Sequence, residues 1–87
     1  MTIQINDLTL EIAKLIVTSC EQYNITADIK CGSVRVDARS IVGIMELIGH
    51  DVDLIIINGR TIDVLDLINQ LYMQRKRKVK ILYEEEK

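Results

Sequence analysis

The pattern of side chains changes abruptly at Ser40, and this change limits how the chain can fold. Val34, Val36 and Ala38 alternate with charged or polar residues, which is typical of a strand with one buried face. Beyond Ser40 the apolar residues follow a helical spacing up to about Leu47. Serine is a preferred helix N-cap, because its hydroxyl accepts a hydrogen bond from a free backbone N–H group. We therefore expect a strand that leads directly into a short helix at Ser40.

The same two spacings divide the rest of the chain into strands and helices. Alternation predicts strands at 2–6, 26–31 and 34–39, and a short β-branched run predicts a central strand at 52–57. Helical spacing predicts helices over about 9–22, about 40–47 and from 61 onward. Gly32-Ser33 supplies a turn, so that the second and third strands form a hairpin with one apolar face. This order predicts an α+β two-layer sandwich with helices on one face of a sheet.

The ends and buried faces of the helices also follow from the sequence. Asp7 or Thr9 can cap the first helix and Thr61 can cap the last, where Asp63 and Asp66 lie near the positive end. Helical spacing predicts the following residues on the buried side of the last helix: Val64, Leu65, Ile68, Leu71 and Tyr72. Cys20 and Cys31 fall at inward-facing positions without a C-x-x-C spacing, so we expect free thiols that pack in the core.

The composition is that of one small domain, and its net charge makes proteins the expected partners. A chain of 87 residues can bury roughly 60 to 65% of its unfolded surface, and with only 3% aromatic residues its core must be aliphatic. The formal net charge of −2 gives no reason to expect binding to nucleic acid or to an anionic membrane. We find no signal peptide and no apolar run of the ~18 residues that a membrane span needs, so a cytoplasmic location is expected.

The sequence offers no combination of residues that would make the chain an enzyme. It lacks a nucleophile–base pair, a supported carboxylate pair and a Gly-rich phosphate loop, and it implies no cofactor. His50, the only histidine, is in a predicted loop beside Asp51 and Asp53. One histidine makes neither a metal site nor a phosphoryl-transfer site by itself, so we expect His50 to be a solvent-facing turn residue.

The segment Asp37–Met45, D-A-R-S-I-V-G-I-M, resembles the region around the regulatory serine of HPr, the small phosphocarrier of the bacterial sugar phosphotransferase system. An N-A-K-S-I-M-G-V-M-like run is usual there, and the resemblance covers most of residues 2–73. It implies a βαββαβα fold whose four-stranded antiparallel sheet has the fourth strand between the first and the second. When the pattern is followed back from Ser40 without a gap, the carrier histidine and arginine fall on Thr9 and Glu11, and only Ala13 matches.

The resemblance implies a regulatory phosphoprotein rather than a carrier, similar to the catabolite-repression HPr paralogue. Ser40 is the candidate phosphorylation site, and the candidate protein-binding residues are Arg39, Ile41, Val42, Ile44 and Met45. Arg39 would orient the phosphate. The implied partners are an HPr-type serine kinase and a transcriptional regulator of catabolite control. Thr9 has no nitrogen to carry an activated phosphoryl group, and Glu11 would repel one.

Two other functions stay open. A structural or adaptor domain could keep the fold and its hydrophobic helix for packing alone, and a sugar-system phosphocarrier is the third hypothesis. We expect the HPr-like domain to span 1–74, followed by a charged extension at 75–87. The extension is either a solvated tail or, through Val79, Ile81 and Tyr83, a strand added to a sheet edge, which would give homodimers.

Overall fold

The computed structural model describes the backbone of residues 1–85 and the side chains of residues 1–74. The elements are β1 (Thr2–Ile5), α1 (Leu10–Gln22), β2 (Thr26–Cys31), β3 (Val34–Asp37), α2 (Ile41–Met45), β4 (Val52–Asn58) and α3 (Thr61–Glu85). This order of strands and helices confirms the expected βαββαβα arrangement. Helix α1 begins after Thr9, whose Oγ1 accepts a hydrogen bond from the Ile12 backbone N–H at 3.2 Å, so Thr9 is the N-cap and Asp7 is not.

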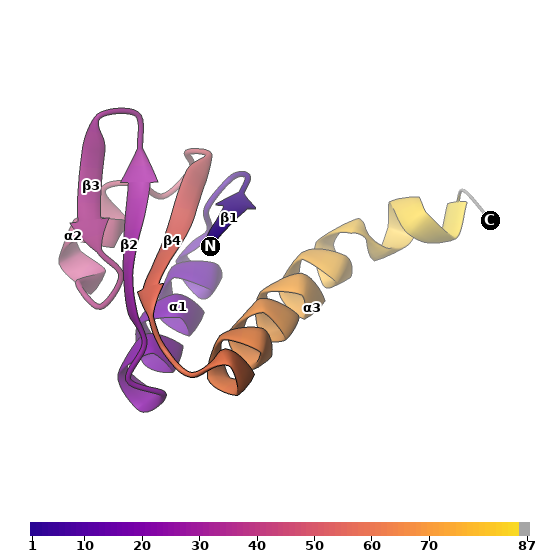
Figure 1. Ribbon diagram of the computed structural model, residues 1–87. Helices are drawn as coiled ribbons and strands as arrows, with labels where there is room; N and C mark the ends of the chain where they lie inside the picture. The colour runs from indigo at the N-terminus through magenta and orange to yellow at the C-terminus, as the bar shows by residue number, and fades with distance from the viewer. Residues whose placement is uncertain (86–87) are drawn as a thin grey trace.

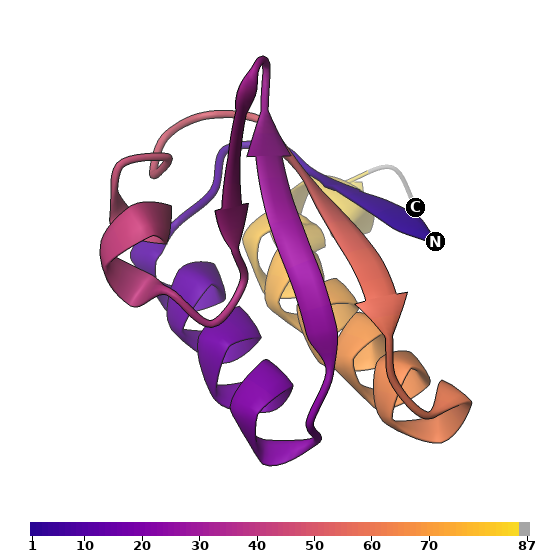
Figure 2. The same cartoon turned by 60° about the vertical axis from the view of Figure 1, so that its left-hand side comes forward.

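The four strands form one antiparallel sheet in the order β1-β4-β2-β3. The fourth strand therefore lies between the first and the second, as the resemblance implied. All three helices lie on one face of this sheet, and α1 and α3 run in opposite directions beneath it (Figures 1 and 2). Gly32, with φ of +60°, makes the tight turn of the β2–β3 hairpin, where an L side chain would be strained.

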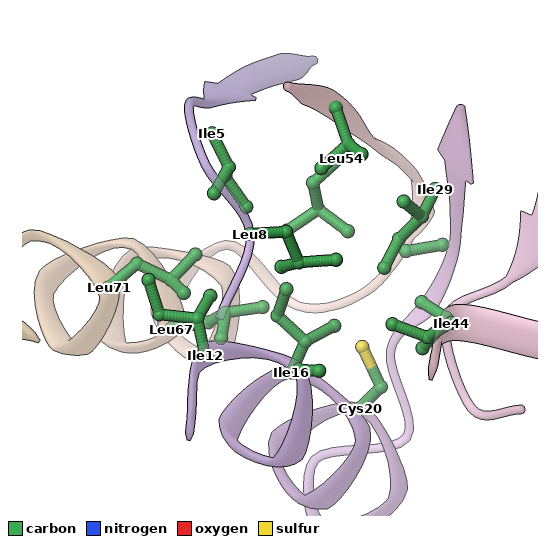
Figure 3. Packing of buried hydrophobic residues seen from close by; sticks show 14 of the residues in the cluster. Ile5, Leu8, Ile12, Ile16, Cys20, Ile29, Ile44, Leu54, Leu67 and Leu71 are labelled. Carbon is green, nitrogen blue, oxygen red and sulfur yellow. The ribbon is translucent and has the colours of Figure 1, made fainter. Parts of the chain in front are cut away.

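An aliphatic core fills the space between the sheet and the helices. Leu54 on β4 and Ile29 on β2 point toward Ile16 on α1, and Cys20 packs into the same layer (Figure 3). The fully buried large side chains are Ile5, Leu8, Ile16, Ile25, Ile29, Ile44, Leu54, Leu67 and Cys20. Burial of each large aliphatic side chain stabilises the fold by about 1.5–3 kcal/mol before conformational entropy is counted.

A hydrogen bond also links the two long helices, and a second bond within α3 supports it. The Tyr23 hydroxyl, at the end of α1, donates to Asp66 Oδ2 on α3 at 2.6 Å, and Gln70 Nε2 donates to the same oxygen at 2.9 Å. The bond to Asp66 raises the pKa of Tyr23, because the carboxylate holds the phenol proton. This contact is therefore present below the ordinary titration range of tyrosine and is lost when the pH rises through the raised value.

The buried face of α3 differs from the prediction. Val64, Leu67 and Leu71 are buried and Ile68 packs against the core, whereas Leu65 and Tyr72 are exposed. The spacing of 64, 67, 68 and 71 is one helical stripe, and the predicted set mixed this stripe with its neighbour. The prediction for Leu65 and Tyr72 was therefore wrong, and it missed Leu67.

Two further differences concern the ends of α3 and the hairpin. Thr61 is the first residue of α3, and the carbonyl of Arg60 accepts the backbone bonds of the first turn, so Thr61 is not the cap. The guanidinium of Arg60 instead pairs with Asp63 at 2.8 Å.

On the edge strand β3, Val34 is exposed and Val36 half-buried, and the buried residue Ala38 lies beyond the strand. The apolar face expected for the hairpin is therefore mostly that of β2.

Helix α3 continues through the expected domain boundary at residue 74 without a break and ends at Glu85. The interpretation of Val79, Ile81 and Tyr83 as a strand is therefore wrong. The side chains of 75–87 lie outside the described residues, so the expected solvation of the extension stays a prediction.

We predict that Leu54→Ala lowers the free energy of unfolding by about 2–5 kcal/mol, because it leaves a cavity at a fully buried position of the central strand. Ile57→Ala on the same strand should cost less than about 1 kcal/mol, since Ile57 is exposed. Urea unfolding followed by circular dichroism measures both. Equal losses for the two variants would contradict the burial pattern of β4.

Candidate docking site at the β3–α2 junction

The turn between β3 and α2 is fixed by hydrogen bonds from both sides. The Asp37 carboxylate accepts a bond from the Arg39 backbone N–H at 2.8 Å, and the Asp37 carbonyl accepts one from Ser40 N–H at 3.0 Å. Between them, Ala38 is fully buried and its N–H donates to the Ala27 carbonyl at 2.9 Å. An aspartate that bonds the backbone two residues on is a common turn device. The junction is therefore held in one shape before any partner binds.

Ser40 is an exposed N-cap, as predicted. Its Oγ accepts a hydrogen bond from Gly43 N–H at 3.4 Å, and its carbonyl accepts one from Ile44 N–H at 3.0 Å. The backbone of Ser40 is extended, with φ of −93° and ψ of 92°. Because the side-chain bond is long and α2 has only five residues, we expect the cap to contribute near the low end of the ~0.5–2 kcal/mol range. The hydroxyl is accessible and only loosely held.

Gly43 is a residue of this site that the sequence analysis did not single out. A Cβ added at Gly43 would lie 3.3 Å from Ser40 Oγ and 3.3 Å from Val36 Cγ1. Both distances are tighter than ordinary van der Waals contact, so the absence of a side chain lets α2 pack close to β3 while Ser40 keeps its cap. A glycine inside a predicted helix was the available signal, since glycine is costly there unless packing requires it.

Arg39 contacts the loop before β2. Its Nε and Nη2 donate to the Ile25 carbonyl at 3.3 Å and 3.0 Å, and Nη2 also donates to Asn24 Oδ1 at 3.4 Å. These bonds tie the junction to the loop that follows α1. A role for Arg39 in orienting a phosphate stays a prediction, and such a contact would compete with the bonds to Ile25.

The residues of α2 divide into a buried and an exposed set. Val42 is 73% exposed and Met45 is 54% exposed, while Ile41 is half-buried. The expected apolar patch beside Ser40 is therefore present. Ile44 is fully buried and lies in the core near Cys20 and Ile29 (Figure 3). We therefore remove Ile44 from the candidate protein-binding residues, because a partner cannot reach it without opening the core.

The start of α1 contains Thr9 and Glu11, the positions on which the carrier histidine and arginine of the sequence resemblance fall. Thr9 is half-buried with its Oγ1 on Ile12 N–H, and Glu11 is exposed in the first turn. The loop residue His50 is exposed, and its carbonyl accepts a bond from Leu8 N–H at 2.9 Å. The backbone of His50 therefore lies beside the residue before Thr9. The sequence reasoning treated these two segments separately, because only the fold brings them together.

Neither a metal site nor a membrane-spanning segment is found within the described part of the chain. There, no group of three or more histidine, cysteine or acidic residues is placed to hold a metal ion. No helix among those residues is both long enough and apolar enough to cross a bilayer.

Comparison with solved structures identifies the architecture. The structure superposes on HPr-C-His from Thermoanaerobacter tengcongensis with a TM-score of 0.63, over 83% of this chain and 91% of that chain, at 22% sequence identity. The chain has the HPr fold. A phosphocarrier protein HPr from Bacillus anthracis str. Ames gives a TM-score of 0.59 over 82% of this chain and 90% of that chain, at 20% identity. No family model matches the sequence, and neither does any curated protein.

The two cysteines of this HPr-fold chain should differ sharply in reactivity. Cys20 is fully buried beneath the junction, and burial raises its pKa from 9.0 to about 11, although the charge of Arg39 partly opposes this shift. Such a shift lowers the thiolate fraction at neutral pH by about 100-fold.

We predict that iodoacetamide at pH 8 modifies the half-buried Cys31 first and reaches Cys20 only after unfolding, as read by peptide mass spectrometry. Equal rates in the folded protein would contradict the packing of Cys20.

Proposed function

We propose that this chain is a regulatory phosphoprotein with the HPr fold, that Ser40 is its phosphorylation site, and that Ile41, Val42 and Met45 dock its protein partners. The observation that supports this most directly is the pairing of an exposed, loosely held Ser40 hydroxyl with exposed apolar side chains on the same short helix. A hydroxyl that serves only as a cap requires no such neighbours, and exposed apolar groups beside a polar site are typical of protein contact surfaces.

Phosphorylation would change the chemistry of this surface strongly. A phosphoserine adds a charge of about −1.5 to −2 and three acceptor oxygens. At Ser40 these oxygens would lie at the start of α2, next to Val42, so that one partner could read both charge and apolar contact. By the resemblance in sequence, the modifying enzyme is an HPr-type serine kinase and the reader is a transcriptional regulator of catabolite control.

A phosphocarrier function has less support. Both solved structures named above are described as HPr proteins, one of them as a phosphocarrier. A carrier must pass its phosphoryl group on, and a phosphoramidate on nitrogen keeps the high transfer potential that an ester on oxygen lacks. Thr9 at the start of α1 offers only a hydroxyl, whose oxygen already caps the helix. Glu11 adds a negative charge in the first turn, where a phosphoryl group needs a cation. We therefore propose that the carrier histidine is lost at Thr9.

The alternative is a structural or adaptor domain that is never phosphorylated. The tight contact of Gly43 with Ser40 and Val36 is compatible with it, because close packing of α2 on β3 serves stability as well as regulation. The two proposals differ in one measurable property, which is whether Ser40 accepts phosphate.

We predict a gain of one phosphate when the protein is incubated with ATP and an HPr-type serine kinase, read by intact mass. Ser40→Ala should abolish the gain, while Ser33→Ala, at another exposed serine in the β2–β3 turn, should leave it unchanged. Because the Ser40 cap is weak, Ser40→Ala should keep the circular dichroism spectrum of the native protein. Absence of phosphate in the native protein would favour the adaptor function.

A parallel incubation with phosphoenolpyruvate and enzyme I separates the carrier from the regulator. A phosphate gained there would support the carrier function and contradict the loss of carrier activity at Thr9. If it disappears in His50→Gln, the exposed loop histidine beside Leu8 is the acceptor. If it disappears in Thr9→Val instead, the hydroxyl at the start of α1 is the acceptor.

The docking residues have their own test. We predict that Val42→Glu lowers the rate of Ser40 phosphorylation by about tenfold or more, because it places a charge in an apolar contact worth more than ~1 kcal/mol. Val34→Glu, a control at another exposed valine at the far end of β3, should have no such effect. Both positions are exposed, so both variants should retain the stability of the native protein. Equal rates for the two variants would exclude Val42 from the contact surface.

A further inference from the structure

The chain has three methionines, and the structure places all three at the surface. Met1 is 68% exposed, Met45 is 54% exposed and Met73 is 50% exposed. None of these three side chains belongs to the hydrophobic core or is among those that pack against it. Peroxides oxidise the thioether of an accessible methionine to the sulfoxide. Each of the three can therefore be modified without opening the core.

Met45 differs from the other two because it lies on the proposed docking surface. It is the last residue of α2, one helical turn beyond Ile41 and three residues beyond Val42. Residues three and four apart on a helix are neighbours, so the Met45 side chain adjoins both. Met1 precedes β1 and Met73 is on α3, and helix α1 lies between α2 and α3 (Figures 1 and 2). Met45 is therefore the methionine that a partner at Ser40 would contact.

Oxidation of Met45 should change the chemistry of this surface and leave the fold intact. The fully buried Ile44 holds α2 to the core, and the Ser40 hydroxyl caps the start of the helix. The Met45 carbonyl accepts a hydrogen bond from Ile48 N–H at 3.4 Å, and the sulfur takes no part in that bond. The support of α2 therefore does not depend on the Met45 thioether.

We propose that Met45 is an oxidation site, and that its sulfoxide weakens docking of the kinase that modifies Ser40. The inference rests on the proposed function, since it concerns regulation of the same surface. In the reaction, a lone pair of the Met45 sulfur attacks one oxygen of hydrogen peroxide, so that an S–O bond forms and the O–O bond breaks. The transferred oxygen passes its proton to the other oxygen, which leaves as water. The sulfur is oxidised and the peroxide is reduced.

The sulfoxide would oppose docking because it is polar. The thioether is flexible and apolar, whereas the sulfoxide oxygen is a hydrogen-bond acceptor. Beside Ile41 and Val42, this oxygen would lose its water when a partner docks and would meet apolar atoms instead. Burial of a polar group without a hydrogen-bond partner is unfavourable, so we expect phosphorylation of Ser40 to slow about tenfold.

Peroxide treatment before the kinase reaction tests the proposal. The full chain is oxidised with hydrogen peroxide, treated with dithiothreitol to restore the thiols and freed of both reagents. It is then incubated with ATP and an HPr-type serine kinase at a concentration below saturation. The initial rate of phosphorylation should fall about tenfold, and methionine sulfoxide reductases should restore it. Peptide mass spectrometry shows which methionines carry the added oxygen.

Three variants assign the effect to one sulfur. Met45→Leu should show the same rate before and after peroxide, whatever that rate is, because it has no sulfur at this position. Met73→Leu, at a methionine of similar exposure, should still slow about tenfold on oxidation. Met45→Gln, which places a polar group on the surface, should slow phosphorylation without peroxide. Circular dichroism checks that each variant and each oxidised sample keeps its fold.

Several results would overturn the proposal. One is an equal loss of rate in the native chain and in Met45→Leu, and another is loss of peroxide sensitivity in Met73→Leu. A native chain that is phosphorylated at its original rate after oxidation, or whose Met45 resists peroxide while folded, would do so as well. These results leave the proposed function standing, because each is measured against a rate before oxidation. Absence of phosphate in the untreated native chain would instead contradict the proposed function, and this inference with it.

Discussion

The fold depends on one layer of aliphatic side chains between the sheet and the helices. Strand β4 is hydrogen-bonded on both sides, to β1 and to β2, so its alternate residues can point only toward the helices or away from them. Leu54 marks the inward face and meets Ile16 and Ile29. Because the chain has neither phenylalanine nor tryptophan, many aliphatic side chains fill this layer rather than a few large aromatic rings. The positions of α1, α2 and α3 all follow from it.

The junction at Ser40 depends on the same layer. Ile44 holds α2 to the core from below, and Ala38 holds the end of β3, so the two residues fix both sides of the turn. Asp37 and Arg39 then bond the turn to itself and to the carbonyl of Ile25. With its backbone restrained in this way, Ser40 is exposed on a rigid support. A binding surface on a rigid element loses little entropy when a partner docks.

Much of the fold follows from local pattern, and the differences have physical causes. The alternation in β2 and the cap at Ser40 are set by neighbours in sequence and were predicted, and the cap at Thr9 was one of two predicted candidates. Leu65 and Leu67 are both apolar, and only the angle at which α3 meets the sheet decides which of them is buried. The burial of Ile44 and the bond from Arg39 to Ile25 likewise depend on the position of α1, which lies far away in the sequence. Pattern alone does not determine contacts of this kind.

Because Gly43 has no side chain, the surface around Ser40 has little room for added volume at that position. A Cβ atom at position 43 would lie 3.3 Å from Ser40 Oγ and 3.3 Å from Val36 Cγ1, so even alanine would crowd both atoms. The hydroxyl would then rotate and weaken its bond to the backbone. The hydrogen atom that glycine carries in place of a methyl group thus keeps Ser40 in its present orientation, so a single added carbon at position 43 would alter the shape of the surface around the hydroxyl.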